Sequence, residues 1–171
     1  MATYPSPMII EDGLVFLCGG YNSGCMMLAI EHAVAGRQFT AQVLYRESPK
    51  LFGSEQQTPV LYGGYLYGVR QRDGQLVCLD PQGRQMWTSG RDKFGSAPYI
   101  IADGLILALD DQGVLTLAEA TPEGYRPLAR AQVIENGVQS WGPMALVDGR
   151  LIVRDLKRMV CVDLREQPQG Q

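Results

Sequence analysis

Short apolar runs separated by turn residues alternate along this chain, and the stretch 58–87 holds one complete set of them. Runs of about five residues rich in Val, Leu and Tyr, bounded by Gly, Pro or Asp-Gly pairs, are typical of short strands joined by tight turns. The stretch therefore predicts a four-stranded antiparallel meander. Its four runs are Val60–Tyr62, Tyr65–Val69, Gln75–Leu79 and Gln85–Trp87.

The same skeleton occurs four times. In each copy a small residue precedes a proline, an apolar run follows, and an Asp-Gly or Gly-Gly turn leads into a second apolar run. The four prolines are 52, 39 and 45 residues apart, which is a spacing typical of propeller blades. The sequence predicts an all-β fold in which 1–171 is a single β-propeller segment of about four repeats, a partial or half propeller. The prolines are Pro7, Pro59, Pro98 and Pro143, and the predicted blades are about 6–48, 58–90, 97–134 and 142–165.

The second run of each repeat is apolar almost throughout, whereas a strand with one wet face would alternate. This pattern predicts strands that neighbouring sheets cover on both faces. The last repeat has three runs and then the polar segment 166–171, so we expect it to lack an outer fourth strand. An open array exposes an apolar face at each end. We therefore expect either further blades of a longer chain or self-association through the end blades.

The segment 25–35, CMMLAIEHAVA, is ambiguous because its apolar residues would also suit a short helix. The repeat places a third strand there. We follow the repeat and predict a strand through Glu31 with a turn near Ala35-Gly36. His32, the only histidine, lies close to that turn and has no second histidine or nucleophile near it in the sequence, so we interpret it as a loop residue.

The chain carries 15 Lys and Arg against 18 Asp and Glu, a formal net charge of −3, which gives no electrostatic reason to expect a nucleic-acid partner. No run approaches the roughly 20 apolar residues of a membrane span. The N-terminal sequence MATYPSP lacks the basic and apolar segments of a signal peptide, so we expect no targeting segment within this chain.

The four cysteines do not form a close C-x-x-C pair, so the sequence does not indicate a zinc site. Alignment of the repeats puts Cys78 and Cys161 at the same position of the third strand, and we expect both to be buried and unpaired. A bridge between Cys18 and Cys25 is an open alternative. The pair Asp110-Asp111 would suit calcium, but ordinary turn chemistry explains it. We predict no catalytic, cofactor-binding or metal-binding residues.

The run Leu79–Trp87 resembles the aliphatic-Asp-x-x-Gly-x-x-x-Trp signature of pyrroloquinoline quinone (PQQ)-like propeller repeats. The phrases YNSGCMMLAIE, YLYGVRQRDGQLVCLD and AEATPEGYRPLARAQV resemble the C-terminal blades of bacterial PQQ-like β-propeller proteins, which are similar to the propeller of the outer-membrane assembly lipoprotein. The resemblance covers almost the whole chain.

The resemblance implies a non-catalytic propeller module that serves as an interaction scaffold for a protein partner and holds no cofactor. The alternative that it leaves open is a fragment of a PQQ-dependent dehydrogenase whose active-site residues, with PQQ and calcium, lie outside this chain. A parent protein like the outer-membrane assembly lipoprotein would be periplasmic or otherwise exported.

In propellers that this chain resembles, the connections between blades and the turns between second and third strands share one face, and loops carry most binding functions. We therefore expect a partner to use residues of these loops. They are Tyr21, Asn22, Arg72, Arg91, Lys93, Phe94, Trp141 and Arg158.

Overall fold

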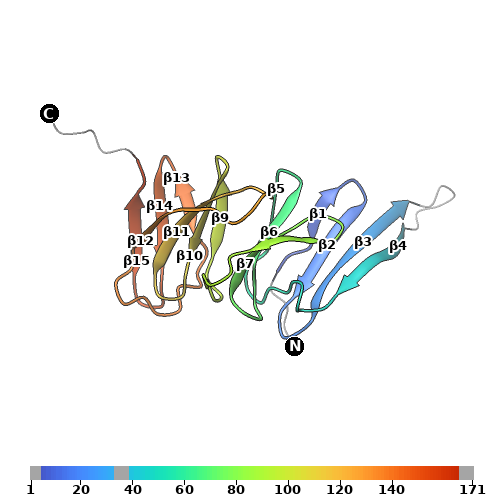
Figure 1. Ribbon diagram of the computed structural model, residues 1–171, viewed down its shortest axis with the longest axis horizontal. Helices are drawn as coiled ribbons and strands as arrows, with labels where there is room; N and C mark the ends of the chain where they lie inside the picture. The colour runs from blue at the N-terminus through green and yellow to red at the C-terminus, as the bar shows by residue number, and fades with distance from the viewer. Residues whose placement is uncertain (1–4, 33–38, 166–171) are drawn as a thin grey trace.

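The computed structural model describes residues 5–32 and 39–165, and these ranges contain strands and turns but no helix. The strands form four separate antiparallel sheets, each a meander in sequence order, which we call blades 1 to 4 (Figure 1). The prediction of an all-β fold built from propeller blades is confirmed. Blade 1 consists of β1 (Met8–Glu11), β2 (Leu14–Gly19), β3 (Gly24–His32) and β4 (Phe39–Glu47), and blade 2 of β5 (Val60–Tyr62), β6 (Tyr65–Arg70), β7 (Gln75–Leu79) and β8 (Gln85–Thr88).

The last two blades follow the same plan, and the described residues of blade 4 form three strands, as the sequence predicts. The strand prediction for the ambiguous segment is confirmed through Glu31, but β3 continues to His32, so the interpretation of His32 as a loop residue was wrong. Residues 33–35 of this segment and the polar tail 166–171 lie outside the described residues. Blade 3 consists of β9 (Tyr99–Ala102), β10 (Leu105–Leu109), β11 (Val114–Glu119) and β12 (Pro127–Gln132), and blade 4 of β13 (Ala145–Val147), β14 (Arg150–Arg154) and β15 (Met159–Asp163).

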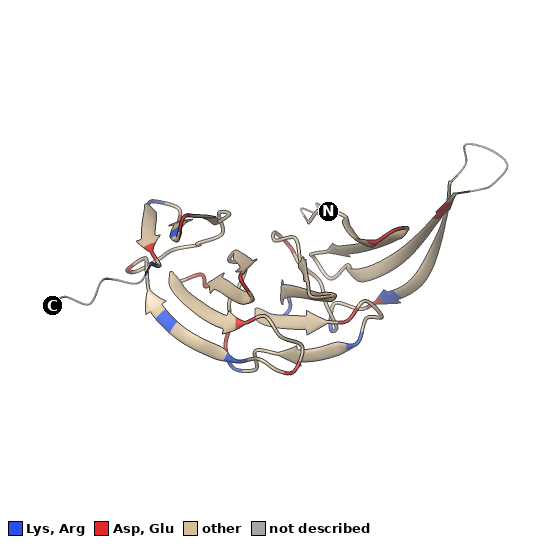
Figure 2. Cartoon of the chain, turned by 90° about the horizontal axis from the view of Figure 1, so that it is seen from above, with Lys and Arg blue, Asp and Glu red and all other residues tan. Residues whose placement is uncertain are grey.

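The four blades stand side by side in an arc, with blade 1 at one end and blade 4 at the other (Figure 2). The turn between the first and second strands is tight because both of its central residues have positive φ, at 48° and 76° for Asp103-Gly104 and 48° and 70° for Asp148-Gly149. This is the geometry that two-residue hairpin turns prefer, and it explains the Asp-Gly pairs of blades 3 and 4. The described part of the chain holds no helix long and apolar enough to cross a membrane.

Side chains of each strand point alternately to the two faces of their sheet, so every inner blade packs on both neighbours. Three hydrophobic clusters result, one in each seam between adjacent blades. The seam between blades 1 and 2 buries Phe16, Met27, Leu66 and Val77; that between blades 2 and 3 buries Tyr67, Leu76, Trp87 and Ile106; that between blades 3 and 4 buries Leu107, Leu109, Leu151 and Val153.

A β-bulge interrupts the pairing of the third and fourth strands at the same place in three blades. The register shifts between Met27 and Leu28 in blade 1, between Cys78 and Leu79 in blade 2, and between Leu117 and Ala118 in blade 3. In each blade the shift directly follows a residue of a seam cluster. The repeat is therefore conserved in register and not only in its turns.

The prediction for the cysteines is half right. Cys78 is buried, but Cys161 is exposed. The two residues do occupy the same repeat position, because Cys78 pairs with Tyr67 and Cys161 pairs with the matching Ile152. Cys78 faces blade 3, whereas no described residue covers the corresponding face of blade 4, so burial of Cys161 was the wrong expectation.

Candidate functional site

The connections between blades and the turns between second and third strands lie together on one side of the arc, which we call the connection face. Hydrogen bonds join the two sets of loops. The Phe94 N–H donates to the Gly74 carbonyl at 2.7 Å, the Gly137 N–H donates to the Gln112 carbonyl at 3.1 Å, and the Leu156 N–H donates to the Val138 carbonyl at 3.2 Å. Each blade-to-blade connection is thus held by a strand turn, so the loops form a fixed surface.

The side chain of Gln57 links the segments that lead into the first strands of blades 2, 3 and 4. The Gln57 side-chain amide donates to the carbonyls of Ser96 at 3.4 Å and of Trp141 at 3.1 Å. These three residues stand at the same offset before the repeat prolines. Sequence reasoning missed this contact, although the shared offset was the signal that could have found it.

Six of the eight residues predicted for partner binding have exposed side chains on the connection face. Tyr21 and Asn22 form the tip of the turn after β2, both with positive φ, and the Tyr21 N–H donates to the Gln71 side chain at 2.8 Å. The remaining exposed residues are Arg72, Arg91, Lys93 and Arg158.

The other two predicted residues, Phe94 and Trp141, are buried or half-buried. Phe94 is only 2% exposed and belongs to the cluster between blades 2 and 3, so its assignment to the binding surface is corrected. The signal for burial was the repeat, because the connection must pass over a seam. Trp141 is half-buried, and its indole Nε1–H donates to the Asp111 carboxylate at 2.7 Å.

Several acidic side chains of the connection face have partners within the protein, whereas the exposed Glu135 carboxylate has none among the described residues. Asp111 accepts from the Trp141 indole and the Ser96 backbone, Glu55 accepts from Gln71 at 2.7 Å, and Asp92 pairs with Arg130. Backbone N–H groups of Lys157 and Arg158, together with the Arg158 guanidinium, hold the pKa of Asp155 at about 2. The Asp155 carboxylate is therefore ionised near neutral pH and already partnered.

Some basic side chains next to these carboxylates make no hydrogen bond or ion pair with a described residue. Burial raises the pKa of Asp73, but hydrogen bonds from Arg70 and the Gln75 backbone, with the charges of Arg70 and Lys93, outweigh it and place the pKa below its ordinary value. Among the described residues, the guanidinium groups of Arg72 and Arg91 have no hydrogen-bond or ion-pair partner. The contact between Phe94 and Gly74 brings the loops that carry Arg72 and Lys93 together. These two loops therefore present exposed cations beside the carboxylates of Asp73 and Asp92.

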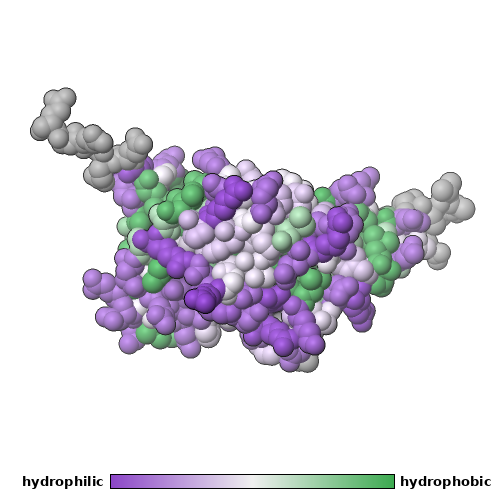
Figure 3. All heavy atoms as spheres, viewed as in Figure 1, coloured by the Kyte–Doolittle hydropathy of each residue, from purple (hydrophilic) through white to green (hydrophobic). Residues whose placement is uncertain are grey.

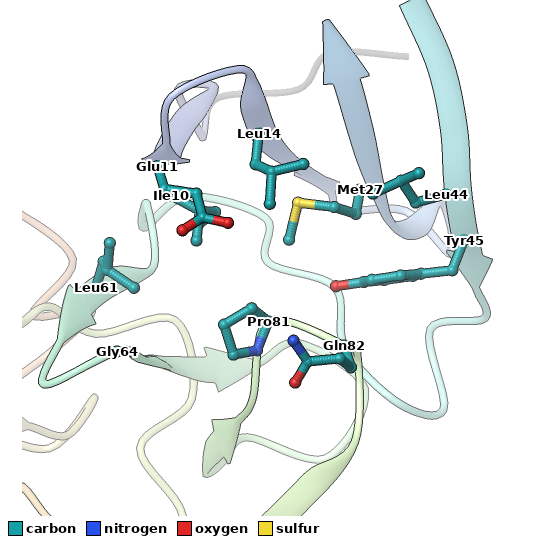
Figure 4. Close-up of a pocket in the computed structure, with 10 residues that line it drawn as sticks. All are labelled: Ile10, Glu11, Leu14, Met27, Leu44, Tyr45, Leu61, Gly64, Pro81 and Gln82. Carbon is teal, nitrogen blue, oxygen red and sulfur yellow. The ribbon is translucent and has the colours of Figure 1, made fainter.

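A hollow of about 470 Å³ opens on the opposite rim, between blades 1 and 2. Figure 4 shows the Tyr45 ring and the Glu11 carboxylate pointing into it beside Leu14 and Met27. The Tyr45 hydroxyl is buried without a hydrogen-bond partner among the described residues. Burial raises the pKa of this hydroxyl well above its ordinary value, so it stays protonated.

Metal-ligating side chains do not gather in the described part of the chain. No group of three His, Cys, Asp or Glu side chains in 5–32 and 39–165 lies close enough to hold a metal ion. Calcium takes six to eight oxygen ligands, and the described ranges hold no carboxylate cluster that could begin such a set. Cys18 and Cys25 face each other across β2 and β3 as free thiols, and burial raises the pKa of both to about 12.

No protein-family model and no curated protein matches this chain. Among solved structures, the chain is similar to BamB from Moraxella catarrhalis, with a TM-score of 0.63 and 13% identity over 92% of this chain and 41% of BamB. It is also similar to AztD from Citrobacter koseri, with a TM-score of 0.56 and 12% identity over 89% of this chain and 42% of AztD.

The computationally designed Ika4 protein is similar as well, with a TM-score of 0.59 and 6% identity over 91% of this chain and 88% of the designed chain. The present chain thus spans less than half the length of BamB and AztD but nearly the whole of Ika4. Identities at this level carry the fold alone. The resemblance to the propeller of the outer-membrane assembly lipoprotein is therefore a resemblance in structure, and this chain is a β-propeller segment of four blades.

Proposed function

We propose that this segment is a non-catalytic interaction module that binds a protein partner through its connection face. The single observation that carries the proposal is the contrast of charges on that face. The carboxylates of Glu55, Asp92 and Asp111 are held by internal hydrogen bonds or ion pairs, whereas Arg72 and Arg91 have no partner among the described residues. The partner that this contrast favours is an acidic segment of another protein, because its carboxylates could pair with the exposed cations Arg72, Arg91 and Lys93.

Rigid loops suit this role. A surface that is ordered before binding loses less conformational entropy on association than a mobile one. The bonds from Gln57 to Ser96 and Trp141 and from Phe94 to Gly74 connect successive loops, so blades 2 to 4 present one continuous platform. Tyr21, which is 44% exposed, adds an aromatic side chain at the blade 1 end of the same platform.

The test is selection of peptides from a random displayed library on the purified chain. We expect acidic peptides to be enriched and their affinity to fall as salt is raised. A triple variant, R72E/R91E/K93E, should lose this binding. The control variant, R84E/R126E, reverses the charges of two exposed cations outside the connection face. It should still bind the acidic peptides. Enrichment of peptides that bind the triple variant equally well would refute the proposal.

The dehydrogenase alternative has its own test. Addition of PQQ and calcium should leave the visible absorption of the cofactor unchanged and should produce no dye-linked alcohol oxidation. A saturable spectral change at one equivalent of PQQ would favour the enzyme fragment over the interaction module.

A further inference from the structure

The two outer faces of the array are the least covered apolar surfaces of this chain. The first-blade face is the side of blade 1 that points away from blade 2, and the last-blade face is the side of blade 4 that points away from blade 3. Figure 3 shows apolar residues gathered toward both ends of the molecule. The first-blade face carries Ile9, Val15, Leu17, Met26 and Leu28, and the last-blade face carries Ala145, Val147, Ile152, Met159 and Cys161.

The last-blade face uses the positions that bury residues in the other blades. Met159 is 71% exposed, whereas its repeat equivalents Leu76 and Leu115 are 0% and 7% exposed. Cys161 is exposed although its equivalent Cys78 is fully buried against blade 3. The fourth blade therefore keeps residues suited to a seam at positions where the described chain supplies no neighbour.

The first-blade face is the counterpart. Ile9 is 73% exposed, while its equivalents in the next blades, Leu61 and Ile101, pack against seam clusters. Val15 corresponds to Leu66 and Ile106, which are 2% and 0% exposed. A shallow hollow of about 440 Å³ lies on this face and is lined by Ile9, Val15, Ile30 and Phe39 among others.

From these matched positions we propose that a second copy of this chain covers both faces. The last-blade face of each copy packs on the first-blade face of the other in the register of the internal seams. The dimer contains this contact twice, once at each end of the array. Two sets of four blades then close a ring of eight. The four blades match 41% of BamB and 42% of AztD, so two copies reach the extent of one such propeller.

Opposite charges would meet at one rim of the proposed contact between the two copies. Arg150 replaces an apolar residue at the position of Leu14 and Leu105. Leu14 lines the same hollow as Gly64 of the next blade, and Leu105 lines the same hollow as Gly149. By this register, Arg150 meets the turn that contains Gly13 in the second copy. That turn carries Asp12, an acidic residue where blade 2 has Gly63.

The experiment measures the mass of the chain in solution by sedimentation or light scattering. The expected result is a dimer of twice 18.8 kDa. Because Ile9 and Met159 are exposed, Ile9→Arg and Met159→Arg should fold normally, as circular dichroism will check, and each should weaken the dimer by about 100-fold or more. Met86→Arg, on the outer strand of blade 2, should leave the dimer intact.

Charge exchange gives a second measurement. Arg150→Asp should weaken the dimer, and addition of Asp12→Arg should restore most of the lost affinity. The Cys161 thiol should be protected from alkylation in the dimer and should react in the Ile9→Arg variant. A monomer at high concentration would overturn the proposal. So would a dimer that resists both arginine variants or leaves Cys161 reactive, or open polymers of growing mass.

Discussion

The seam between blades 2 and 3 is filled at a place where the seam between blades 3 and 4 is hollow. Trp87 occupies this place in the filled seam, where it is 7% exposed, donates its indole N–H to the Thr121 carbonyl at 2.7 Å and packs on Tyr67 and Tyr125 at centroid distances of 6.0 and 5.8 Å. Ala129 holds the same repeat position in the next seam and leaves a space of about 450 Å³. Leu105, Leu117 and Leu146 help to line that space.

The backbone register is the same in both seams, so the difference comes from the side chains that meet there, with Trp87 against Ala129 and Tyr67 against Leu107. The seam between blades 1 and 2 has Tyr45 at this position, beside the hollow of about 470 Å³, and the Tyr45 hydroxyl has no partner among the described residues. A repeat can thus preserve strand pairing while the free energy that each seam contributes varies. We expect the middle seam to be the most stable part of the array.

Removal of the Trp87 side chain should produce the largest change in stability, and it tests the comparison between the filled and the hollow seam. Trp87→Ala should reduce the free energy of unfolding by about 3–5 kcal/mol, because it deletes a buried indole and leaves the Thr121 carbonyl without its donor. Urea denaturation measures the loss. The neighbouring Met86→Ala should change stability by about 0.5 kcal/mol or less, since Met86 is exposed. Equal effects of the two variants would contradict the comparison.

The next largest change in stability comes from shortening the side chain at one repeat position, either in the middle seam or in the last blade. Leu76→Ala should cost about 2–5 kcal/mol because Leu76 is fully buried in the middle seam. Met159→Ala, at the matching position of the last blade, should cost about 0.5 kcal/mol or less in the monomer. Both values come from urea midpoints, with the Met159 variant compared in the monomeric Ile9→Arg background. A large cost at Met159 in that background would show that blade 4 is covered from within the same chain.

Filling the hollow seam should produce a smaller gain. Ala129→Trp places an indole where blade 2 has Trp87, and burial of part of that ring should stabilise the fold by about 1 kcal/mol. Thermal unfolding would show the gain as a higher midpoint. Leu128→Trp is the control, because adjacent residues of a strand point to opposite faces and this ring would remain outside the seam. Stabilisation by the control alone would argue that the hollow does not accept an indole.

The hydroxyl of Tyr45 gives the smallest effect and one of opposite sign to the first two. Tyr45→Phe should leave stability unchanged or raise it by up to about 1 kcal/mol, because the lost hydroxyl is buried and makes no hydrogen bond with a described residue. Trp87→Phe, which removes a bonded N–H at the matching position, should be destabilising. A loss of more than about 1 kcal/mol in Tyr45→Phe would reveal a partner for the hydroxyl.

The fold could be predicted from the sequence because its signals are local and repeated. The proline and Asp-Gly skeleton marks the strands, and the positive φ values of Asp103 and Asp148 show why those turns need such residues. The repeat also resolved the strand through Glu31, where periodicity alone allowed a helix. Cys161 shows where this reasoning stops, because its burial depends on a neighbouring blade and not on its own strand.

The candidate site was less predictable, since it depends on contacts between loops. Sequence reasoning placed Arg72 and Arg91 on a connecting surface, and the structure finds both exposed there. It could not separate Phe94, which turns into a seam, from the adjacent exposed Lys93. Gln57 was missed because its role requires the carbonyls of two other blades at hydrogen-bond distance.

The bulge shared by blades 1 to 3 has a consequence for how such repeats change in evolution. Because it follows the seam residues Met27, Cys78 and Leu117, everything beyond it belongs to a hairpin that can grow without altering which side chains enter the seam. Blade 1 shows such growth, with nine residues in each of β3 and β4 against five in β7 and four in β8. Hairpin tips beyond the bulge, such as the turn at Gln82, are therefore where insertions or a fused reporter peptide should be tolerated best.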